Sequence, residues 1–341
     1  MNYDSSNDGK SILLADYGWV GDIPEGPGRL GRIVRVDRGE CDLVTAEGSI
    51  RAVSDSRRSQ DQTAPVTGDW VLVLQDPEMG YFINQVLPRT SVLSRRDPAE
   101  ESIEQVLVSN VDLVIIVHGL DRPLPPGRLE RYLVLAWNSG AEVAVVLTKA
   151  NRNLSVTNEV TELVRVIAPE VKLLTIDIPD NPESLCAVEC LFKVGMTAAL
   201  LGESGAGKSS LVNALVGSEV METGKVRTGD RKGRHTTVSR ELVHRPAGGL
   251  LVDMPGLRAI GLWDAQEALE RVFGDLEKLS ESCRFSDCAH GVEPDCAVQA
   301  AVREGQMEEQ RIVRYQALRK ELDDQKAREA SRKQAGGNRR R

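Results

Sequence analysis

Long apolar runs and aromatic side chains are scarce in this chain of 341 residues. The chain contains no run of about 18 apolar residues, the length that a helix needs to cross a bilayer. The N-terminus, MNYDSSNDGK, also lacks the basic-then-apolar pattern of a secretory signal. With 41% hydrophobic and 28% charged residues, the composition is that of an ordinary soluble protein. We therefore expect a cytoplasmic protein with two or three domains, at roughly 150 residues per domain.

An excess of positive charge is also lacking, because the net charge is −8. This balance argues against indiscriminate binding to nucleic acid. Two segments depart from it: residues 225–245 carry seven Lys or Arg against two acids, and the last eleven residues carry five basic residues and no acid. Such runs are most often solvated surface, so they indicate RNA binding only beside other evidence.

Residues 197–213, TAALLGESGAGKSSLVN, organise the rest of the chain. An apolar run, a glycine-rich turn and a helical pattern together fit the phosphate-binding motif G-x-x-x-x-G-K-[ST]. Its glycines let backbone N–H groups face phosphate oxygens at the N-terminus of a helix. Lys208 is expected to reach the terminal phosphates and Ser209 to ligate Mg2+. The predicted nucleotide-binding residues are Gly202, Glu203, Ser204, Gly205, Ala206, Gly207, Lys208, Ser209 and Ser210.

A second motif, Asp253-Met254-Pro255-Gly256, follows an apolar run downstream of the phosphate loop. In P-loop enzymes an aspartate at the end of a buried strand holds Mg2+ through water, and the glycine N–H senses the terminal phosphate. Asp253 and Gly256 are therefore predicted to act in catalysis. Leu257 stands where many GTPases keep a glutamine that orients the attacking water, and leucine cannot do that.

The base-recognition motif N-K-x-D of GTPases does not follow Asp253. A degenerate version, Thr148-Lys149-Ala150-Asn151, instead ends the apolar run 143–147, ahead of the phosphate loop. A parallel sheet tolerates such reordering if the original chain ends lie close together. The motif order predicts a circularly permuted GTPase domain.

The regions around these motifs differ in their patterns. Residues 1–27 are polar and punctuated by Gly and Pro, which predicts a flexible tail. Short β-type runs over residues 28–97 predict a small OB-type barrel, with an SH3-like barrel as the alternative. Alternating strands and helices over residues 98–264 predict an α/β domain with a largely parallel sheet. Residues 265–328 are helical in pattern, and residues 329–341 form a basic tail.

The helical region contains Cys283-x4-Cys288-x-His290-x5-Cys296. Three thiolates and one imidazole are the four ligands that tetrahedral Zn2+ takes in a structural site with no open position. Disulfides fit a cytosolic chain poorly. The remaining cysteines, at positions 41, 186 and 190, show no ligand spacing, so the sequence predicts one structural Zn2+.

Together these parts resemble the small-subunit ribosome biogenesis GTPases of the RsgA, or YjeQ, family, over residues 28–328. The most specific signatures are GESGAGKSSL at 202–211, GRHTT at 233–237, DMPGLR at 253–258 and CRFSDCAHGVEPDCAV at 283–298. The resemblance implies an OB barrel, a permuted GTPase domain and a C-terminal zinc domain. It also implies a monomeric enzyme, independent of membranes, that binds the maturing small (30S) ribosomal subunit and its rRNA. GTP hydrolysis, with Mg2+, would be much faster in the docked state.

By the same resemblance, Thr148, Lys149, Ala150 and Asn151 would bind the base, and Thr236 or Thr237 would close on Mg2+. His235 is a candidate for orienting the water, although a solvent-facing or RNA-facing role is equally open. The sequence departs from the family at Asn151, where aspartate is expected, and at residues 175–177, where a Ser-Ala type motif would lie. Guanine selectivity is thus less secure than nucleotide binding, and an ATP-using enzyme is one alternative. The other is a nucleotide-gated rRNA-binding module whose turnover is incidental.

Overall fold

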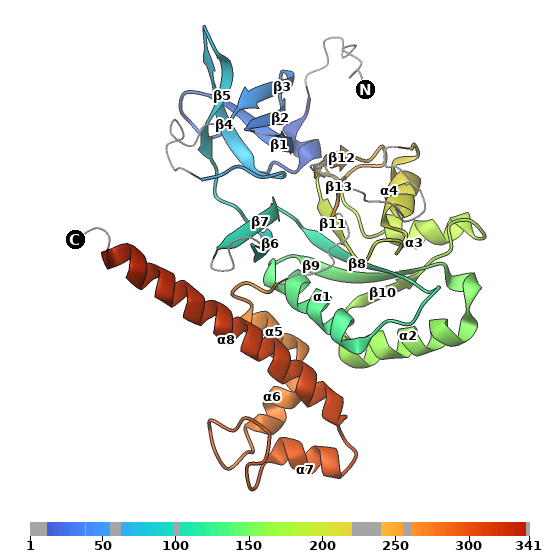
Figure 1. The fold of residues 1–341 in the computed structure, drawn as a ribbon. Helices are drawn as coiled ribbons and strands as arrows, with labels where there is room; N and C mark the ends of the chain where they lie inside the picture. The colour runs from blue at the N-terminus through green and yellow to red at the C-terminus, as the bar shows by residue number, and fades with distance from the viewer. Residues whose placement is uncertain are drawn as a thin grey trace, which may run out of the picture.

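The computed structural model describes residues 12–37, 39–54, 63–97, 103–219, 240–254 and 261–338, the last six as backbone only. Along the chain come a small barrel, a two-stranded ribbon, a sheet covered by helices on both faces, and a helical C-terminal part (Figure 1). No helix among the described residues combines the length and hydropathy needed to cross a membrane.

The barrel contains five strands: β1 (Arg29–Asp37), β2 (Glu40–Thr45), β3 (Gly48–Val53), β4 (Trp70–Asp76) and β5 (Gly80–Val86). It closes in the order β1-β2-β3-β5-β4, and only the β3–β5 pair is parallel. A five-stranded barrel in this order is of the OB type, which confirms that prediction over the SH3-like alternative.

Part of the predicted N-terminal tail is folded against this barrel. A 3-10 helix at Leu14–Tyr17 buries Leu14 in a small cluster with Leu30, Trp70 and Leu72. The ring of Trp19 lies 5.0 Å from that of Trp70, edge to face. Apolar packing and hydrogen bonds to the barrel hold this segment, although the surrounding sequence is polar.

The ribbon, β6 (Val92–Arg96) and β7 (Glu104–Ser109), leads into a six-stranded sheet of order β10-β9-β8-β11-β13-β12. All neighbours in this sheet are parallel except β12 and β13. The strands are β8 (Leu113–Gly119), β9 (Glu142–Thr148), β10 (Lys172–Thr175), β11 (Thr197–Leu201), β12 (Leu242–His244) and β13 (Leu250–Asp253).

Helices cover both faces of this sheet because alternate strand residues point to opposite sides. On one face, α1 (Pro126–Asn138), α2 (Leu154–Ile167) and α5 (Gln266–Val272) pack against side chains such as Ile116 and Leu147. On the other face, α3 (Leu185–Glu189) and α4 (Lys208–Val216) pack against Ile115 and Val146. The predicted α/β architecture is therefore present.

The C-terminal part contains α6 (Gly274–Ser280), α7 (Ala297–Arg303) and α8 (Glu309–Asn338). The long helix α8 runs past α5 and continues beyond it as a projecting rod (Figure 1), crossing residue 329 without a break. Ile312, Tyr315, Leu318 and Leu322 of α8 belong to the same apolar core as α1. The helical part is thus packed directly on the α/β domain.

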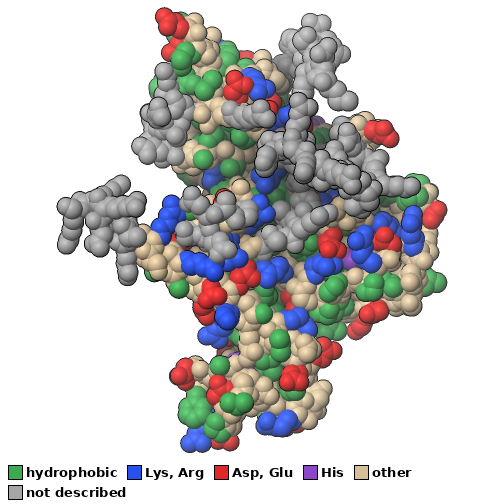
Figure 2. All heavy atoms as spheres, viewed as in Figure 1, with side chains coloured by type: hydrophobic (Ala, Val, Ile, Leu, Met, Phe, Trp, Pro, Cys, Tyr) green, Lys and Arg blue, Asp and Glu red, His purple; other side chains and the backbone are tan. Residues whose placement is uncertain are grey.

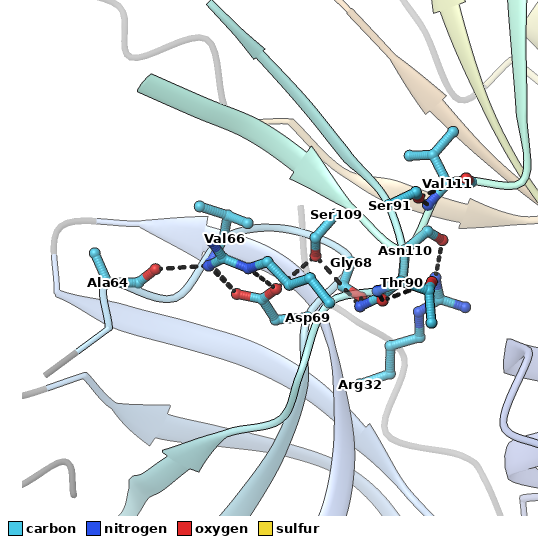
Figure 3. Close-up of polar contacts among 11 residues, drawn as sticks. Arg32, Ala64, Val66, Gly68, Asp69, Thr90, Ser91, Ser109, Asn110 and Val111 are labelled. Atoms are coloured by element: carbon cyan, nitrogen blue, oxygen red, sulfur yellow. Dashed lines mark hydrogen bonds and ion pairs between the residues drawn. The ribbon is translucent and has the colours of Figure 1, made fainter. Parts of the chain in front are cut away.

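A buried polar junction joins the barrel to the sheet (Figure 3). The fully buried carboxylate of Asp69 accepts hydrogen bonds from Arg89 at 2.7 and 2.8 Å and from the Ser109 hydroxyl at 2.5 Å. Arg32, also buried, donates to the backbone oxygens of Asn110, at 3.0 Å, and of Tyr17. These bonds fix the barrel beside the start of β8.

Candidate nucleotide and metal sites

The phosphate loop connects the buried strand β11 to α4, which begins at Lys208. Glycine is required at Gly202, because a Cβ there would lie 2.3 Å from the carbonyl oxygen of Val117. It is also required at Gly207, the N-cap of α4, whose φ is +94°. The close contact with β8 and the left-handed turn together aim the N-terminus of α4 at the loop.

Lys208 is buried and folds back over the loop, donating to the carbonyl oxygens of Gly202 at 2.8 Å and Glu203 at 2.9 Å. Burial lowers the pKa of its ammonium group. Because its hydrogen-bond partners among the described residues are neutral carbonyl groups, an anion in the loop would attract it more strongly.

Two oxygen groups converge beside this lysine. The hydroxyl of Ser209, at the start of α4, lies 3.5 Å from Asp253 Oδ2, at the end of β13. Asp253 Oδ1 is buried without a hydrogen-bond partner among the described residues. Burial raises the pKa of Asp253, while Lys208 and the Ser209 bond act in the opposite direction. A hydroxyl and an unsatisfied carboxylate are oxygen ligands of the kind that Mg2+ takes, so these residues fit that ion.

The predicted base loop, Thr148–Asn151, is joined directly to the phosphate loop. The Thr148 hydroxyl donates to the Ala206 carbonyl at 2.7 Å, and Lys149 Nζ donates to the Gly205 carbonyl at 2.7 Å. Lys149 has a φ of +61°, which turns the chain sharply after β9. The motif that precedes the phosphate loop in sequence by some fifty residues therefore lies beside it in space.

Two aspartates also border the base loop: Asp121, which the sequence analysis did not single out, and Asp177, which lies in the segment 175–177 where the resemblance places a Ser-Ala type motif. Asp121, just beyond β8, accepts from Lys149 at 2.8 Å, and Asp177, just beyond β10, accepts from the backbone N–H of Asn151 at 2.9 Å. Both follow the carboxyl ends of parallel strands, where ligands of open α/β sheets bind. That position is the signal that could have identified them.

A third unpredicted contact comes from α1, where Arg128 donates to the Glu203 carboxylate at 2.8 Å.

The sequence-predicted residues His235, Thr236, Thr237 and Gly256 lie outside the described residues, as does Leu257.

The four predicted zinc ligands, Cys283, Cys288, His290 and Cys296, present ligand atoms that all lie within 4.8 Å of one another. The sulfurs of Cys283 and Cys296 are 3.8 Å apart, and they lie 3.7 and 3.6 Å from His290 Nδ1. A tetrahedral ion with bonds of about 2.3 Å to sulfur and about 2.0 Å to nitrogen requires ligand separations of about 3.6 to 3.8 Å. The donor set and its spacing therefore fit Zn2+.

Backbone contacts support this cluster. Gln299 donates through Nε2 to the His290 carbonyl at 2.6 Å and through its backbone N–H to Cys296 Sγ at 3.4 Å. The carboxylate of Glu293 accepts from the backbone N–H groups of Ala289 and Gly291. The loop is thus held in shape by residues other than the four ligands.

The strand order and the two linked loops define a circularly permuted P-loop GTPase, in which the base-side strands β8–β10 precede the phosphate strand β11. Two solved structures share this fold. YjeQ from Thermotoga maritima aligns with a TM-score of 0.61 and 26% identity, covering 86% of this chain and 98% of that one. YloQ, described as a circularly permuted GTPase, aligns with a TM-score of 0.60 and 22% identity, covering 87% of this chain and 96% of that one.

Sequence comparison identifies the family. The RsgA GTPase family model matches residues 86–263. The small ribosomal subunit biogenesis GTPase RsgA of Streptomyces avermitilis is 42% identical over 322 residues, covering 90% of this chain and 85% of that protein. Its namesake from Leptospira interrogans is 37% identical over 320 residues, covering 91% and 88%. The chain belongs to the RsgA GTPase family, and it is a GTP hydrolase.

An ABC transporter model also matches, over residues 186–341. That range includes the phosphate loop, which ATPases and GTPases of the P-loop class share. The match covers less than half of the chain, and family membership confirms the GTPase prediction over an ATP-using enzyme.

Proposed function

We propose that this GTPase binds the maturing small ribosomal subunit in the cytoplasm as a monomer, and that GTP hydrolysis there times its release. One observation carries the proposal. The phosphate loop, the base loop and Asp253 lie together at one edge of the sheet, and the same chain contains an OB barrel. The relatives that align with 90% and 91% of this chain are named small ribosomal subunit biogenesis GTPases.

In this proposal the residues of the site have separate roles. Lys208 leaves the carbonyls of Gly202 and Glu203 to contact the terminal phosphates, while loop N–H groups hold the remaining phosphate oxygens. Ser209 and Asp253 hold Mg2+, which supplies charge neutralisation at the phosphates. Thr148 and Lys149 keep the base loop at a fixed distance from the phosphate loop.

The surface also suits contact with RNA. Lys and Arg side chains lie across the middle of the face shown in Figure 2, interspersed with acidic groups. OB barrels often bind oligonucleotides on one face. Although the protein is acidic overall, the Lys and Arg side chains on this face are available to contact phosphate groups.

Multiple-turnover GTP hydrolysis, measured with and without purified small subunits, tests the proposal. We expect small subunits to raise the rate by orders of magnitude, large subunits to have no effect, and Lys208→Ala to abolish turnover in both cases. A rate that small subunits leave unchanged would contradict the proposal and favour a nucleotide-gated RNA-binding module.

We further propose that Cys283, Cys288, His290 and Cys296 hold one structural Zn2+. Metal analysis of the purified protein should give one zinc per chain, and Cys288→Ala should lose it together with the order of the C-terminal loop. Cys190→Ala is the matched control, because Cys190 is exposed and lies outside the cluster. Wild-type protein without zinc would contradict this assignment.

A further inference from the structure

The base loop carries Asn151 at the position where a carboxylate would form the strongest hydrogen bonds to guanine. Guanine presents two donors, N1–H and the exocyclic amine, and a carboxylate can accept both with charge assistance. The side chain of Asn151 offers only one acceptor beside one donor. If both guanine donors are to form hydrogen bonds, the second acceptor must come from another residue.

Asp177 is a carboxylate in direct hydrogen-bond contact with the base loop. It is 5% exposed, and its Oδ2 accepts from the backbone N–H of Asn151 at 2.9 Å. Its Oδ1 makes no hydrogen bond within the part of the chain that the structure describes. One oxygen therefore holds the base loop while the other keeps its capacity to accept.

The backbone around Asp177 is held firmly in place. Its N–H donates to the Ser184 hydroxyl at 3.1 Å, and its carbonyl accepts from the Asn181 N–H at 2.7 Å. The preceding residue, Ile176, donates to the Leu147 carbonyl at 2.8 Å at the end of β9. Asp177 is thus fixed to the strand that carries the base loop.

The other aspartate at this edge, Asp121, is already neutralised. It binds the Lys149 ammonium at 2.8 Å and lies 3.5 Å from the Arg122 guanidinium. Lys149 in turn reaches toward the phosphate loop. Asp121 therefore orients Lys149, whereas Asp177 faces Asn151.

We propose that Asp177 determines guanine specificity: its free Oδ1 accepts the N1–H of guanine, and the Asn151 side-chain oxygen accepts the exocyclic amine. In this arrangement the carboxylate that binds guanine comes from the end of β10, and the base loop contributes an amide beside it. This inference rests on the nucleotide site proposed above.

The Asp177→Asn substitution tests recognition of the base separately from support of the base loop. Asparagine still offers one oxygen to the Asn151 N–H, but its NH2 replaces the acceptor that faces the base. We expect affinity for GTP and ITP, which both carry N1–H, to fall about 10- to 100-fold, since a charged hydrogen bond is lost. Affinity for ATP, which lacks N1–H, should stay within about twofold of wild type. The exposed Asp180→Asn is the matched control.

Competition binding of GTP, ITP and ATP gives distinct outcomes. An equal loss for all three nucleotides would show that Asp177 only supports the loop, and no loss for any would show that it does not face the base; either result overturns the inference. Wild-type protein that binds none of them would refute the nucleotide site itself.

An exchange of the two side chains adds a second test. Asn151→Asp alone places two carboxylates side by side, so it should weaken GTP binding, while Asn151→Asp with Asp177→Asn should restore it. A single Asn151→Asp variant that binds GTP more tightly than wild type, with no further change in the double variant, would overturn the inference.

Discussion

Glu130 is expected to be the main electrostatic link between the α/β domain and α8. Its side chain is fully buried in α1, where it accepts from Arg311 at 2.9 Å and from Arg314 at 2.7 and 3.1 Å. Removing one partner of a buried ion pair typically costs about 3–5 kcal/mol, since the other charge is left unpaired. Glu130→Ala would leave both Arg311 and Arg314 without this carboxylate.

Two features of the cluster reduce that figure. Arg311 keeps a second carboxylate, Asp275, at 2.7 Å, and the Arg314 side chain is 21% exposed, so it can turn toward water. We therefore expect a loss of about 2–3 kcal/mol in the stability of α8 docking. This corresponds to roughly 30- to 140-fold faster amide exchange in the packed part of α8.

Hydrogen exchange followed by mass spectrometry measures this local opening directly, whereas a single melting temperature would mix several domains. Arg131→Ala is the comparison, because its pair with Glu321 is more exposed and should contribute only about 1 kcal/mol. Protection of residues 309–325 that is unchanged in Glu130→Ala, or lowered less than in Arg131→Ala, would refute the reasoning.

Three further predictions concern the other parts of the molecule. Lys208→Ala should lower single-turnover GTP hydrolysis by a hundredfold or more, about 3 kcal/mol, while the circular dichroism spectrum stays unchanged; undiminished turnover would exclude the phosphate-loop assignment. Asp253→Asn should stabilise nucleotide-free protein by about 1 kcal/mol, seen as a higher melting temperature, because a buried carboxylate whose Oδ1 has no hydrogen-bond partner among the described residues becomes an uncharged amide. It should also abolish Mg2+-dependent hydrolysis; a lower melting temperature would contradict the stability prediction. Gly68→Ala should destabilise the junction between barrel and sheet by about 2 kcal/mol or more, since φ is +94° and the new Cβ would lie 2.2 Å from the Ser109 carbonyl oxygen; equal urea midpoints for variant and wild type would count against that contact.

Motifs whose chemistry depends on local sequence could be predicted before the structure. The strand, loop and helix around Lys208 follow from apolar periodicity and glycine placement. The cysteine spacing at 283–296 similarly identified four side chains that the structure brings together. The permuted order followed from a base loop placed ahead of the phosphate loop.

Residues that act through tertiary contacts were not predictable in the same way. Asp121 lies in a loop, where acidic residues are also common for turn formation alone. The resemblance marked residues 175–177, but for a Ser-Ala type motif, so it gave no role to the carboxylate of Asp177. Arg32 and Glu130 are charged residues in ordinary amphipathic patterns, and only the packing of distant segments buries them. Tyr17 and Trp19 lie in a polar segment, so their contact with the barrel gives no local signal.

The sheet order also determines how the protein would bear a mechanical load. β8 follows the barrel and the two-stranded ribbon, β13 leads toward the C-terminal helices, and both lie directly beside β11. Because these three strands are parallel, a pull between the two ends of the chain acts on opposite ends of β8 and β13 and shears their hydrogen-bond ladders lengthwise. The strand that carries the phosphate loop therefore lies in the force-bearing path, whereas β10, at the sheet edge beyond β9, lies outside it.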